Sequence, residues 1–541
     1  MPNLAAVHEA IAAAIPEHEC IVFRDRRLSW ADVTERTRRL ADVFRQHGLG
    51  CQRERPGLAN WESGQDHIGL YLTNGNEYLE GMLGAFKARA VPFNVNYRYV
   101  DEELEYLFEN ADAKAVVYHG GFAPTLARIR ARLPQVRLWL QVDDGSGEPL
   151  LPGALDYEAA LAEARPLPPR DLSPDDLYIL YTGGTTGMPK GVLWRHEDVF
   201  HAALHTGKAR GLDEIVARAQ RGGPRALPAP PFMHGAAHWV VFNMWHAGGT
   251  VLVQSRPERL DPEDIWSTVE RERATALTLV GDAFARPLLE ELQRGSYDVS
   301  SLRLVTSGGA ILSAATKQDL LDALPNAKVL DALGSSESGQ QAAQISTRAG
   351  PATSGDFEID PASVVLTEDL TGIVEAGSGE KGWLARSGYV PLGYYGDPEK
   401  TARTFPSVNG VRFSVPGDRA SVEADGTLRL HGRDSVTINT GGEKVFAEEV
   451  EQALKHHPAV WDAVVVGTPH DRWGQQVTAV VKLRDGHQVA ESELRDAARD
   501  HLAAYKLPKA FVFVDEVLRA PSGKADYRWA KDTAVAGLAE P

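Results

Sequence analysis

Short apolar segments alternate with segments of helical periodicity along most of the chain. From about residue 67, the apolar runs HIGLYLTN, AVPFNVN and AKAVVYHG are separated by the helical patterns EYLEGMLGAFKARA and DEELEYLFENAD. The alternation returns in TVLVQS, PEDIWSTVERERA, TALTLVG, PLLEELQRG and LRLVTSGG. Because such alternation is typical of βαβ units, it predicts an α/β body whose parallel sheets are flanked by helices on both faces.

The pattern changes twice toward the C-terminus. Around residues 350–380, Gly, Pro, Asp and Ser become frequent and the strand-like pieces are short, which predicts a β-rich subdomain. After residue 435, a helix, two strands, a helix and a strand follow, the size of a small independent α+β domain. We therefore predict a large N-terminal domain, residues 1–432, and a small C-terminal domain, residues 433–541.

Other segments predict little regular structure or no membrane passage. The first residues, MPNLAAVHEAIAAAIPEHE, predict a short amphipathic helix and lack the pattern of a secretion signal. Residues 141–170 are rich in Gly, Pro and acidic residues, which indicates a surface excursion, and residues 51–66 have no physical explanation in the sequence. The apolar stretch AAHWVVFNMWHAGGTVLVQ is interrupted by Asn243, His246 and two glycines, so we expect no integral membrane segment and a cytoplasmic location.

Composition narrows the classes of ligand. The 541 residues are 43% hydrophobic and 24% charged, and 57 Lys and Arg stand against 74 Asp and Glu, a formal charge of −17. This balance argues against a nucleic-acid partner, so a phosphorylated ligand would need local clusters of positive charge and a metal ion. Two cysteines, Cys20 and Cys51, are too few for a disulfide framework or a zinc site.

The stretch YTGGTTGMPKGV, residues 181–192, places glycines and threonines in front of one lysine. Exposed backbone N–H groups, hydroxyls and the Lys190 ammonium suit a polyanion such as phosphate, although a tight turn is the alternative. It is not a Walker A loop, because Pro189 precedes the lysine and Gly191 follows it. The preceding run LYILYT predicts a buried strand, so the loop would leave a sheet edge where α/β proteins bind ligands.

Further stretches carry candidate chemistry, each with an ordinary structural alternative. LVTSGGAIL, residues 304–312, ends a strand in bare backbone where a flat ring could lie, or is a plain turn. DALGSSESG offers Glu337 as a ligand for Mg²⁺ or as a solvated carboxylate. VPGDRA offers Asp418 to the hydroxyls of a ribose or as a turn residue, and RAPSGKADYRWA holds Lys524 in a tight turn, where an exposed lysine is the alternative.

The order of these stretches along the chain is more specific than any one of them. With His234 in PPFMHGAA and Arg433 in GRDSVTINTGGEKV, the series resembles the adenylate-forming superfamily over roughly residues 18–530. That superfamily includes acyl-CoA synthetases, the adenylation domains of nonribosomal peptide synthetases and beetle luciferases. Its members activate a carboxylate with ATP to give acyl-AMP and pyrophosphate, and most then transfer the acyl group to the thiol of coenzyme A.

The resemblance implies ATP, Mg²⁺ and coenzyme A as cofactor and co-substrates, and a role for each matching residue. Lys524, Glu337 and His234 would be catalytic, and Thr182 and Glu337 would hold the metal ion. The phosphates of ATP would be bound by Thr182, Gly183, Gly184, Thr185, Thr186, Gly187 and Lys190. Adenine would be surrounded by Gly308, Gly309, Ala310, Leu333, Gly334, Ser335 and Ser336, and the ribose would be bound by Asp418 and Arg433. Coenzyme A would pass along a pantetheine passage lined by Gly441 and Gly442. Leu333 stands where many relatives carry an aromatic residue, so packing on the base would be aliphatic or come from elsewhere.

The chemistry explains these residue types. In-line attack of a carboxylate on the α-phosphorus needs positioning and neutralisation of charge on the leaving pyrophosphate, and Lys524 is the predicted cation. The resemblance also implies that the small domain rotates after this step about a hinge near Asp434 and Ser435.

The motifs FNVNYRY, LYTGGTTGMPKGVLWRHEDV, GSSESG, INTGGEKVFAEEVE and PSGKADYRWAK look like those of bacterial fatty-acyl-CoA synthetases, including activators of steroid side chains. An apolar acid is predicted from an acyl pocket lined by Trp239, Phe242, Met244, Val280 and Phe284. The sequence thus predicts an acyl-CoA ligase of lipid metabolism. An acyl-AMP ligase that serves a carrier protein and a non-catalytic nucleotide-binding regulator stay open, as does a homodimer.

Overall fold

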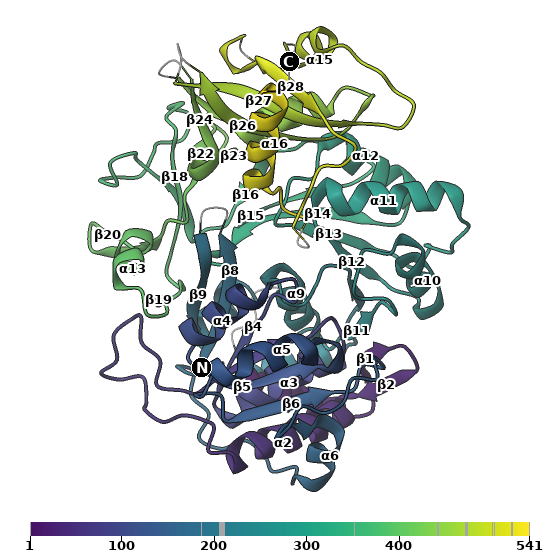
Figure 1. The fold of residues 1–541 in the computed structure, drawn as a ribbon, viewed down its shortest axis with the longest axis vertical. Helices are drawn as coiled ribbons and strands as arrows, with labels where there is room; N and C mark the ends of the chain where they lie inside the picture. Colours follow the sequence, from purple (N-terminus) through teal and green to yellow (C-terminus); the bar gives the residue numbers. More distant parts are fainter. Residues whose placement is uncertain are drawn as a thin grey trace.

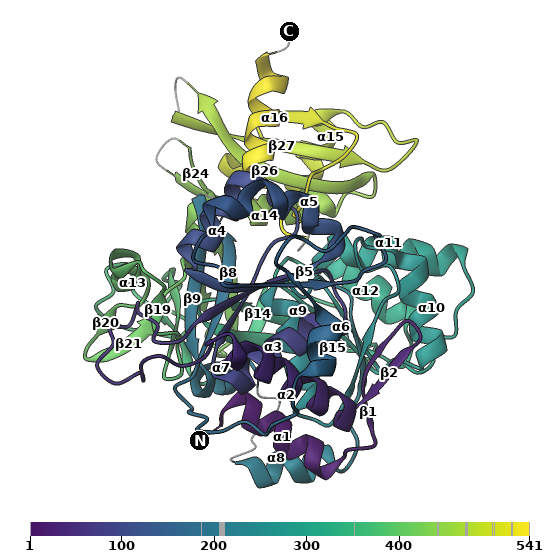
Figure 2. The same ribbon diagram turned by 60° about the horizontal axis from the view of Figure 1, so that its bottom comes forward.

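The computed structural model describes residues 2–539 except 185–186, 205–210, 351, 441–442, 471–473, 500, 503 and 521–522. A large body, purple to green in Figure 1, holds most of the chain, and a smaller yellow-green body stands on it, as the turned view in Figure 2 confirms. Three sheets organise these bodies within the described residues. The predicted α/β class with a smaller α+β C-terminal unit is confirmed.

The longest sheet is parallel in one half, apart from its antiparallel edge strand β2, and antiparallel in the other half. Neighbouring strands from β1 through β11, β10, β12 and β13 to β14 run parallel, and pairing is antiparallel from β14 onward, where the sequence predicts a β-rich region. Its strands are β1 (Glu19–Phe23), β2 (Arg26–Ser29), β10 (Arg225–Pro228), β11 (Thr250–Val253), β12 (Ala276–Leu279), β13 (Leu304–Gly308), β14 (Lys328–Ser335), β15 (Gly339–Ser346), β16 (Asp356–Ile359), β17 (Ser363–Leu366), β18 (Gly382–Ser387), β20 (Ser407–Val408), β21 (Val411–Ser414), β22 (Asp418–Val422) and β23 (Leu428–Arg433).

The second sheet has parallel strands buried on both faces. Such strands form continuous apolar runs, as in HIGLY of β3, where every residue is buried. The sheet order is β19-β9-β8-β4-β3-β5-β6-β7, with strands β3 (His67–Tyr71), β4 (Val91–Asn94), β5 (Ala113–His119), β6 (Leu138–Val142), β7 (Leu155–Asp156), β8 (Leu177–Gly184), β9 (Gly187–Arg195) and β19 (Gly393–Tyr394).

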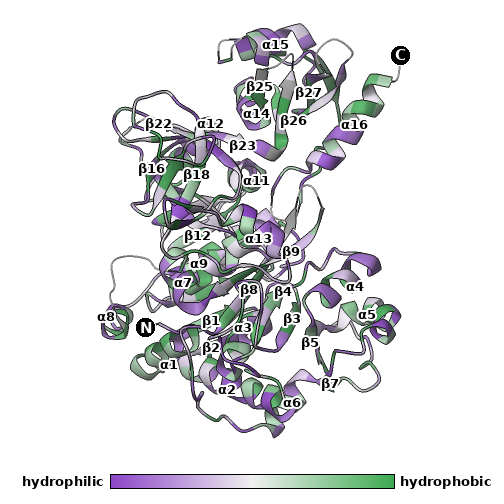
Figure 3. Cartoon of the chain, turned by 90° about the vertical axis from the view of Figure 1, so that its left-hand side faces the viewer, coloured by the Kyte–Doolittle hydropathy of each residue, from purple (hydrophilic) through white to green (hydrophobic). Residues whose placement is uncertain are grey.

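The small body contains the third sheet, β25-β24-β27-β26 with β28 beside β27. In the small body, β26 is hydrophobic, whereas α15 is largely hydrophilic and lies on the outside (Figure 3). Its elements are β24 (Thr437–Thr440), β25 (Glu443–Phe446), α14 (Ala447–Lys455), β26 (Val460–His470), β27 (Gly474–Leu483), α15 (Glu491–Arg499), β28 (Ala510–Phe513) and α16 (Tyr527–Ala539). The sequence pattern did not predict β24, β25 and α16.

Helices cover the sheets of the large body. Among the described residues, none of the helices is both long enough and apolar enough to cross a membrane. The large body contains α1 (Leu4–Ala14), α2 (Trp30–Gln46), α3 (Asn76–Ala88), α4 (Asp101–Asn110), α5 (Ala123–Ile129), α6 (Tyr157–Glu163), α7 (His196–Ala202), α8 (Leu212–Ala219), α9 (Gly235–Trp245), α10 (Pro262–Glu272), α11 (Gly281–Arg294), α12 (Ala314–Ala323) and α13 (Pro398–Thr404).

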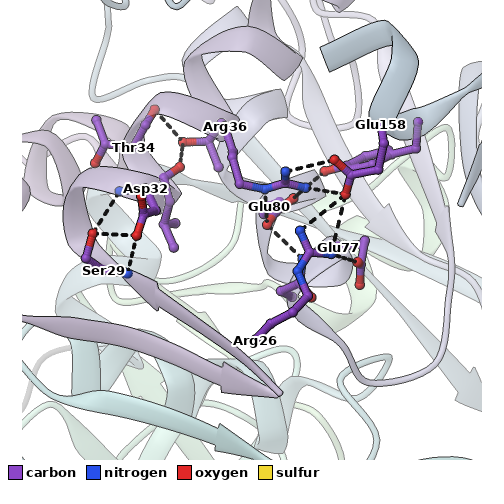
Figure 4. A network of polar contacts seen from close by, with 12 residues as sticks. Arg26, Ser29, Asp32, Thr34, Arg36, Glu77, Glu80 and Glu158 are labelled. Atoms are coloured by element: carbon purple, nitrogen blue, oxygen red, sulfur yellow. Dashed lines mark hydrogen bonds and ion pairs between the residues drawn. The ribbon is translucent and has the colours of Figure 1, made fainter. Parts of the chain in front are cut away.

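Residues 141–170 are more ordered than a surface excursion. They contain β7 and α6, and a polar network fixes α6 against α2 and α3 (Figure 4). The guanidinium of Arg36 lies between Glu80, at 2.8 Å, and Glu158, at 2.8 Å, while the buried Tyr157 hydroxyl donates to Glu80 at 2.6 Å. The sequence prediction was incomplete here because these contacts join residues far apart in the chain.

Residues 51–66 form a loop closed on itself. The amides of Gln52 and Arg53 both donate to the carbonyl of Gly64 at 2.8 Å. Beyond the loop, the Trp61 carbonyl accepts from the amide of Gly396 at 2.9 Å. The segment therefore supports the turn that precedes α13.

Candidate active site

The predicted phosphate loop is the end of a hairpin. Strands β8 and β9 pair antiparallel, with Thr182 opposite Lys190 and Gly184 opposite Gly187, and the hairpin extends toward the small body (Figure 1). The strands reach further than the apolar run LYILYT predicts, because pairing between them continues through the glycines. Thr185 and Thr186, at the tip, lie outside the described residues.

Bare backbone lies at the ends of β13 and β14, where the sequence predicts an adenine site. Gly308 is in register with Ala332, and Gly309 has φ +87°, a left-handed conformation that favours glycine. A Cβ on Gly309 would lie 3.9 Å from Cε of Lys524. Ala310 follows directly, and the predicted residues Leu333, Gly334 and Ser335 end the neighbouring strand.

Glu337 sits in the turn between β14 and β15, which three donors fix. The Tyr394 hydroxyl donates to its Oε1 at 2.8 Å, and the Ser414 hydroxyl donates to its carbonyl at 2.6 Å. The indole of Trp194 donates to the carbonyl of Ser336 at 2.9 Å. Burial, and then Glu337, raise the pKa of Tyr394 far above its usual value, so this hydroxyl stays a donor.

Asp418 and Arg433 face each other on neighbouring strands. They are in register between β22 and β23, and Nε of Arg433 lies 3.0 Å from Oδ1 of Asp418. The nearby Asp418 carboxylate raises the pKa of Arg433, so the guanidinium stays charged. Asp418 is buried. Because Nε of Arg433 bonds Oδ1, the other oxygen, Oδ2, is the one that fits the predicted contact with a ribose.

Lys524 belongs to the small body, and its side chain reaches this group of residues although part of it stays exposed to solvent. Burial, followed by the charge of Arg433, lowers its pKa, while Glu337 and Asp418 raise it. Three of the predicted site residues thus influence this ammonium, and its Cε lies beside the bare backbone of Gly309. Lys524 is thus exposed in part, as in the alternative, but its stem lies against the large body beside Gly309.

His234 lies close to the lysine. It precedes α9, and burial, then the Lys524 charge, lower its pKa to about 3, so the ring is neutral. Its Nε2 is buried, and within the described part of the chain the atom has no hydrogen-bond partner. By contrast, Nδ1 of the nearby His238 bonds the Phe232 carbonyl at 2.7 Å and its other nitrogen contacts Tyr178, as expected for a core histidine.

Contacts that the sequence did not reveal hold the lysine turn. Arg519 binds Asp462 through two bonds of 2.6 and 2.7 Å and donates to the Gly523 carbonyl at 3.1 Å. Gly523 has φ +75°, and a Cβ there would lie 3.1 Å from Cγ1 of Val280, so this turn packs tightly against the large body. No local spacing signals the Asp462–Arg519 pair, because its members are 57 residues apart.

A second contact joins the two bodies. Arg286 of α11 donates to the carbonyl of Trp461, and its guanidinium lies 5.8 Å from the centre of the Trp461 ring. Arg484 approaches the same ring at 5.1 Å. Since Trp461 precedes Asp462, this contact adjoins the pair that holds the lysine turn.

The five residues predicted to line an acyl pocket do not form one cluster. Phe242 packs in the core beneath the second sheet, Met244 packs with Ala226 and Ala276, and Val280 and Phe284 belong to a third cluster beside the lysine turn. Residues two apart on a helix point in different directions, so Phe242 and Met244 cannot share one face of α9. Trp239 is partly buried, with its ring centre 6.4 Å from that of Trp194.

The predicted metal ligands suit Mg²⁺ only together with a phosphorylated substrate. Glu337 is the single carboxylate of the predicted pair, and the described residues contain no group of three or more His, Cys, Asp or Glu that could hold a metal by itself. Mg²⁺ prefers six oxygen ligands and commonly takes one or two carboxylates plus substrate phosphates. A carboxylate and the Thr182 hydroxyl fit that pattern.

The predicted hinge and passage are only partly described. β23 ends at Arg433 in the longest sheet, a short 3-10 helix covers Asp434–Val436, and β24 begins the third sheet at Thr437. Gly441 and Gly442, the predicted lining of the pantetheine passage, lie outside the described residues.

Comparisons with known proteins match most of the chain. The profile of the AMP-binding enzymes matches residues 8–358, and that of the AMP-binding enzyme C-terminal domain matches residues 449–524. The chain is 53% identical to a medium-chain acyl-CoA ligase, Mig, of Mycobacterium avium over 99% of this chain and 98% of the relative. It is 42% identical to the 3-oxocholest-4-en-26-oate–CoA ligase of Rhodococcus rhodochrous, over 98% and 95%. Among solved structures, ATP-bound MatB of Rhodopseudomonas palustris superposes with a TM-score of 0.80 at 25% identity, over 97% and 98%.

Proposed function

The chain belongs to the family of AMP-binding enzymes, and from this premise we propose how its residues carry out the reaction. It is an AMP-forming acyl-CoA ligase: it joins a carboxylic acid to coenzyme A through acyl-AMP and consumes ATP. The alternatives of a carrier-protein ligase and a non-catalytic regulator are not favoured.

One observation carries the proposal for the site. Lys524 crosses from the small body and lies beside Gly309, where its ammonium feels the charges of Glu337, Asp418 and Arg433. An ammonium that projects from the small body onto this part of the large body can bind acyl and phosphate oxygens placed there. This is the arrangement that adenylate formation requires.

In the first step a carboxylate oxygen of the acid attacks the α-phosphorus of ATP. The bond from that phosphorus to the bridging oxygen breaks, and pyrophosphate leaves with the electron pair. Lys524 contacts the oxygens that gather charge in the transition state, in a site closed by the small body. His234 is neutral, so it does not bring a second cation to this point.

Bound Mg²⁺ would neutralise charge on the phosphate oxygens. Glu337 would hold it from the turn fixed by Tyr394, and Thr182 would add a hydroxyl from the hairpin. The carboxylate stays oriented because its Oε1 accepts from a hydroxyl that remains protonated.

In the second step the sulfur of coenzyme A attacks the acyl carbon, and AMP leaves with the electrons of the acyl–phosphate bond. The thiol must reach the place that Lys524 fills, so the small body moves between the steps. The short segment Asp434–Val436, between the last strand of one sheet and the first of another, is the proposed hinge.

The proposed acid is apolar, a medium- or long-chain fatty acid or a steroid side-chain acid. The names of the similar ligases from Mycobacterium avium and Rhodococcus rhodochrous support this range. Neutral His234 and the apolar side chains Val280 and Phe284 beside the lysine turn also disfavour a charged substrate tail.

A panel of fatty, branched, aryl and steroid side-chain acids tests the proposal. With Mg²⁺ and ATP, we expect AMP and an acyl-CoA thioester, measured by mass spectrometry, from at least one apolar acid and only when coenzyme A is added. Acyl-AMP that accumulates but never yields thioester would instead indicate a carrier-protein ligase. No pyrophosphate exchange with any acid would indicate a regulator.

A further inference from the structure

A second lysine lies beside Lys190 in the predicted phosphate site. Lys400 is the third residue of α13, and its Nζ lies 4.5 Å from the centre of the Tyr394 ring. The hydroxyl of that ring donates to Glu337. Lys400 is therefore one side chain away from the proposed metal ligand, and no motif in the sequence signalled it.

Backbone pairing fixes this juxtaposition. Tyr394 is in register with Val192 of β9, and the amide of Tyr395 donates to the Gly191 carbonyl at 2.8 Å. The segment that leads to α13 thus runs along the strand that carries Lys190. Asp397, the N-cap of α13, accepts from the Lys400 amide at 2.9 Å.

The positive charges of Lys190 and Lys400 are only partly neutralised by the carboxylate of Asp397. Nζ of Lys190 lies 3.6 Å from Oδ2 of Asp397, whose other oxygen is already the helix cap. Burial first, and then the neighbouring Lys190 ammonium, lower the pKa of Lys400 to about 8, against the opposing effect of Glu337 and Asp397. Two ammonium groups held this close repel each other, and an anion between them relieves the repulsion.

We propose that Lys400, together with Lys190, binds the β- and γ-phosphates of ATP and the pyrophosphate that leaves. This rests on the proposed function and adds a residue to its site. When the bond to the α-phosphorus breaks, negative charge moves onto the pyrophosphate oxygens, so cations placed there stabilise the transition state more than bound ATP.

A structural role for Lys400 is the competing explanation, because its stem covers the Tyr394 ring. Lys400→Met keeps an unbranched stem over the ring but removes the charge. Lys400→Arg keeps the charge. Arg403→Met removes a charge from an exposed residue of the same helix and is the matched control.

The experiment measures binding of pyrophosphate and of ATP to the full chain with Mg²⁺ by calorimetry. We expect Lys400→Met to weaken both by about ten- to a hundredfold, as for loss of a charge-assisted contact, with partial recovery in Lys400→Arg and no change in Arg403→Met. Thioester formation from supplied acyl-AMP, which involves no pyrophosphate, should be unchanged. Unchanged pyrophosphate affinity in Lys400→Met would overturn the proposal.

Two further readouts keep the outcome clear. Should the Met variant unfold, as judged by its Tm, Lys400→Gln takes its place with the same expectation. If the wild-type chain releases no AMP with any acid while Lys400→Met still binds pyrophosphate weakly, the proposed function fails and the phosphate contact stands. If the wild type is active and the variant binds normally, the contact alone fails.

Discussion

The two ends of the site are built differently. Around the predicted phosphates, Lys190, Lys400 and Glu337 all belong to the large body and are tied together by strand pairing and by Tyr394. At the acyl end, Lys524 comes from the small body and reaches its position through the packed turn at Gly523. In the proposed mechanism the nucleotide site would therefore persist if the bodies separate, whereas the Lys524 ammonium would be in place only while they are in contact.

This difference separates the effects of substitutions. A change on the phosphate side should weaken ATP binding whatever the position of the small body. A change on the lysine side should leave ATP binding intact and affect only the half-reaction that needs contact between the bodies. The following substitutions test that separation.

The largest effect is expected for Lys524→Ala. Removal of the cation should slow acyl-AMP formation at least a hundredfold, as loss of one preorganised donor does elsewhere. Thioester formation from supplied acyl-AMP should change little, because the lysine leaves before that step. Single-turnover assays of each half-reaction measure this, with exposed Lys531→Ala of α16 as the control. Equal loss in both half-reactions would contradict the role.

Arg519→Lys should have the next largest effect. Lysine keeps a charge for Asp462 but loses the two-bond geometry and the contact with the Gly523 carbonyl. The lysine turn would then be less well oriented, and kcat for adenylation should fall about tenfold while KM for ATP stays the same. A rise in KM for ATP with normal kcat would show that the two ends of the site are not separable.

The site residues show how much of the site could be predicted from the sequence. The order of motifs led to Lys524, Glu337, Asp418 and Arg433, which the structure brings together, because each lies in a glycine-rich turn that leaves a recognisable local pattern. Alternating apolar and helical segments likewise predicted the parallel sheets.

Long-range contacts explain the rest. Lys400 meets Lys190 across more than two hundred residues, and Arg519 meets Asp462 through a fold that no local spacing encodes. The acyl pocket stays a prediction: the apolar residues were recognised in the sequence, but their distribution over three clusters depends on which face of α9 or α11 meets which neighbour.

Arg286→Met should have a smaller effect on the contact between bodies. It removes the bond to the Trp461 carbonyl while the core around α11 stays filled. We expect adenylation to slow about threefold, equivalent to less than 1 kcal/mol, and thioester formation from acyl-AMP to be unchanged or faster. Arg294→Met, at an exposed position of the same helix, is the control. A loss of ATP affinity instead would place Arg286 on the phosphate side of the comparison.

The smallest effect concerns Glu448, at the junction of the bodies. Its carboxyl is buried where α14 meets Gly432 of β23, and burial, then Glu451, raise its pKa to about 8 from the usual 4.5. The native state therefore holds a proton that the unfolded state releases between these pH values. Stability due to this group is full below about pH 4.5 and is lost as pH rises toward 8.

Glu448→Gln cannot ionise, so its Tm should match that of the wild type near pH 5 and exceed it by about 1–3 °C at pH 9. Thermal unfolding at several pH values measures the difference between the two curves, in which every other titrating group cancels. A difference that does not depend on pH would mean that the junction is hydrated, and that the two bodies are less tightly joined on the lysine side than the buried carboxyl implies.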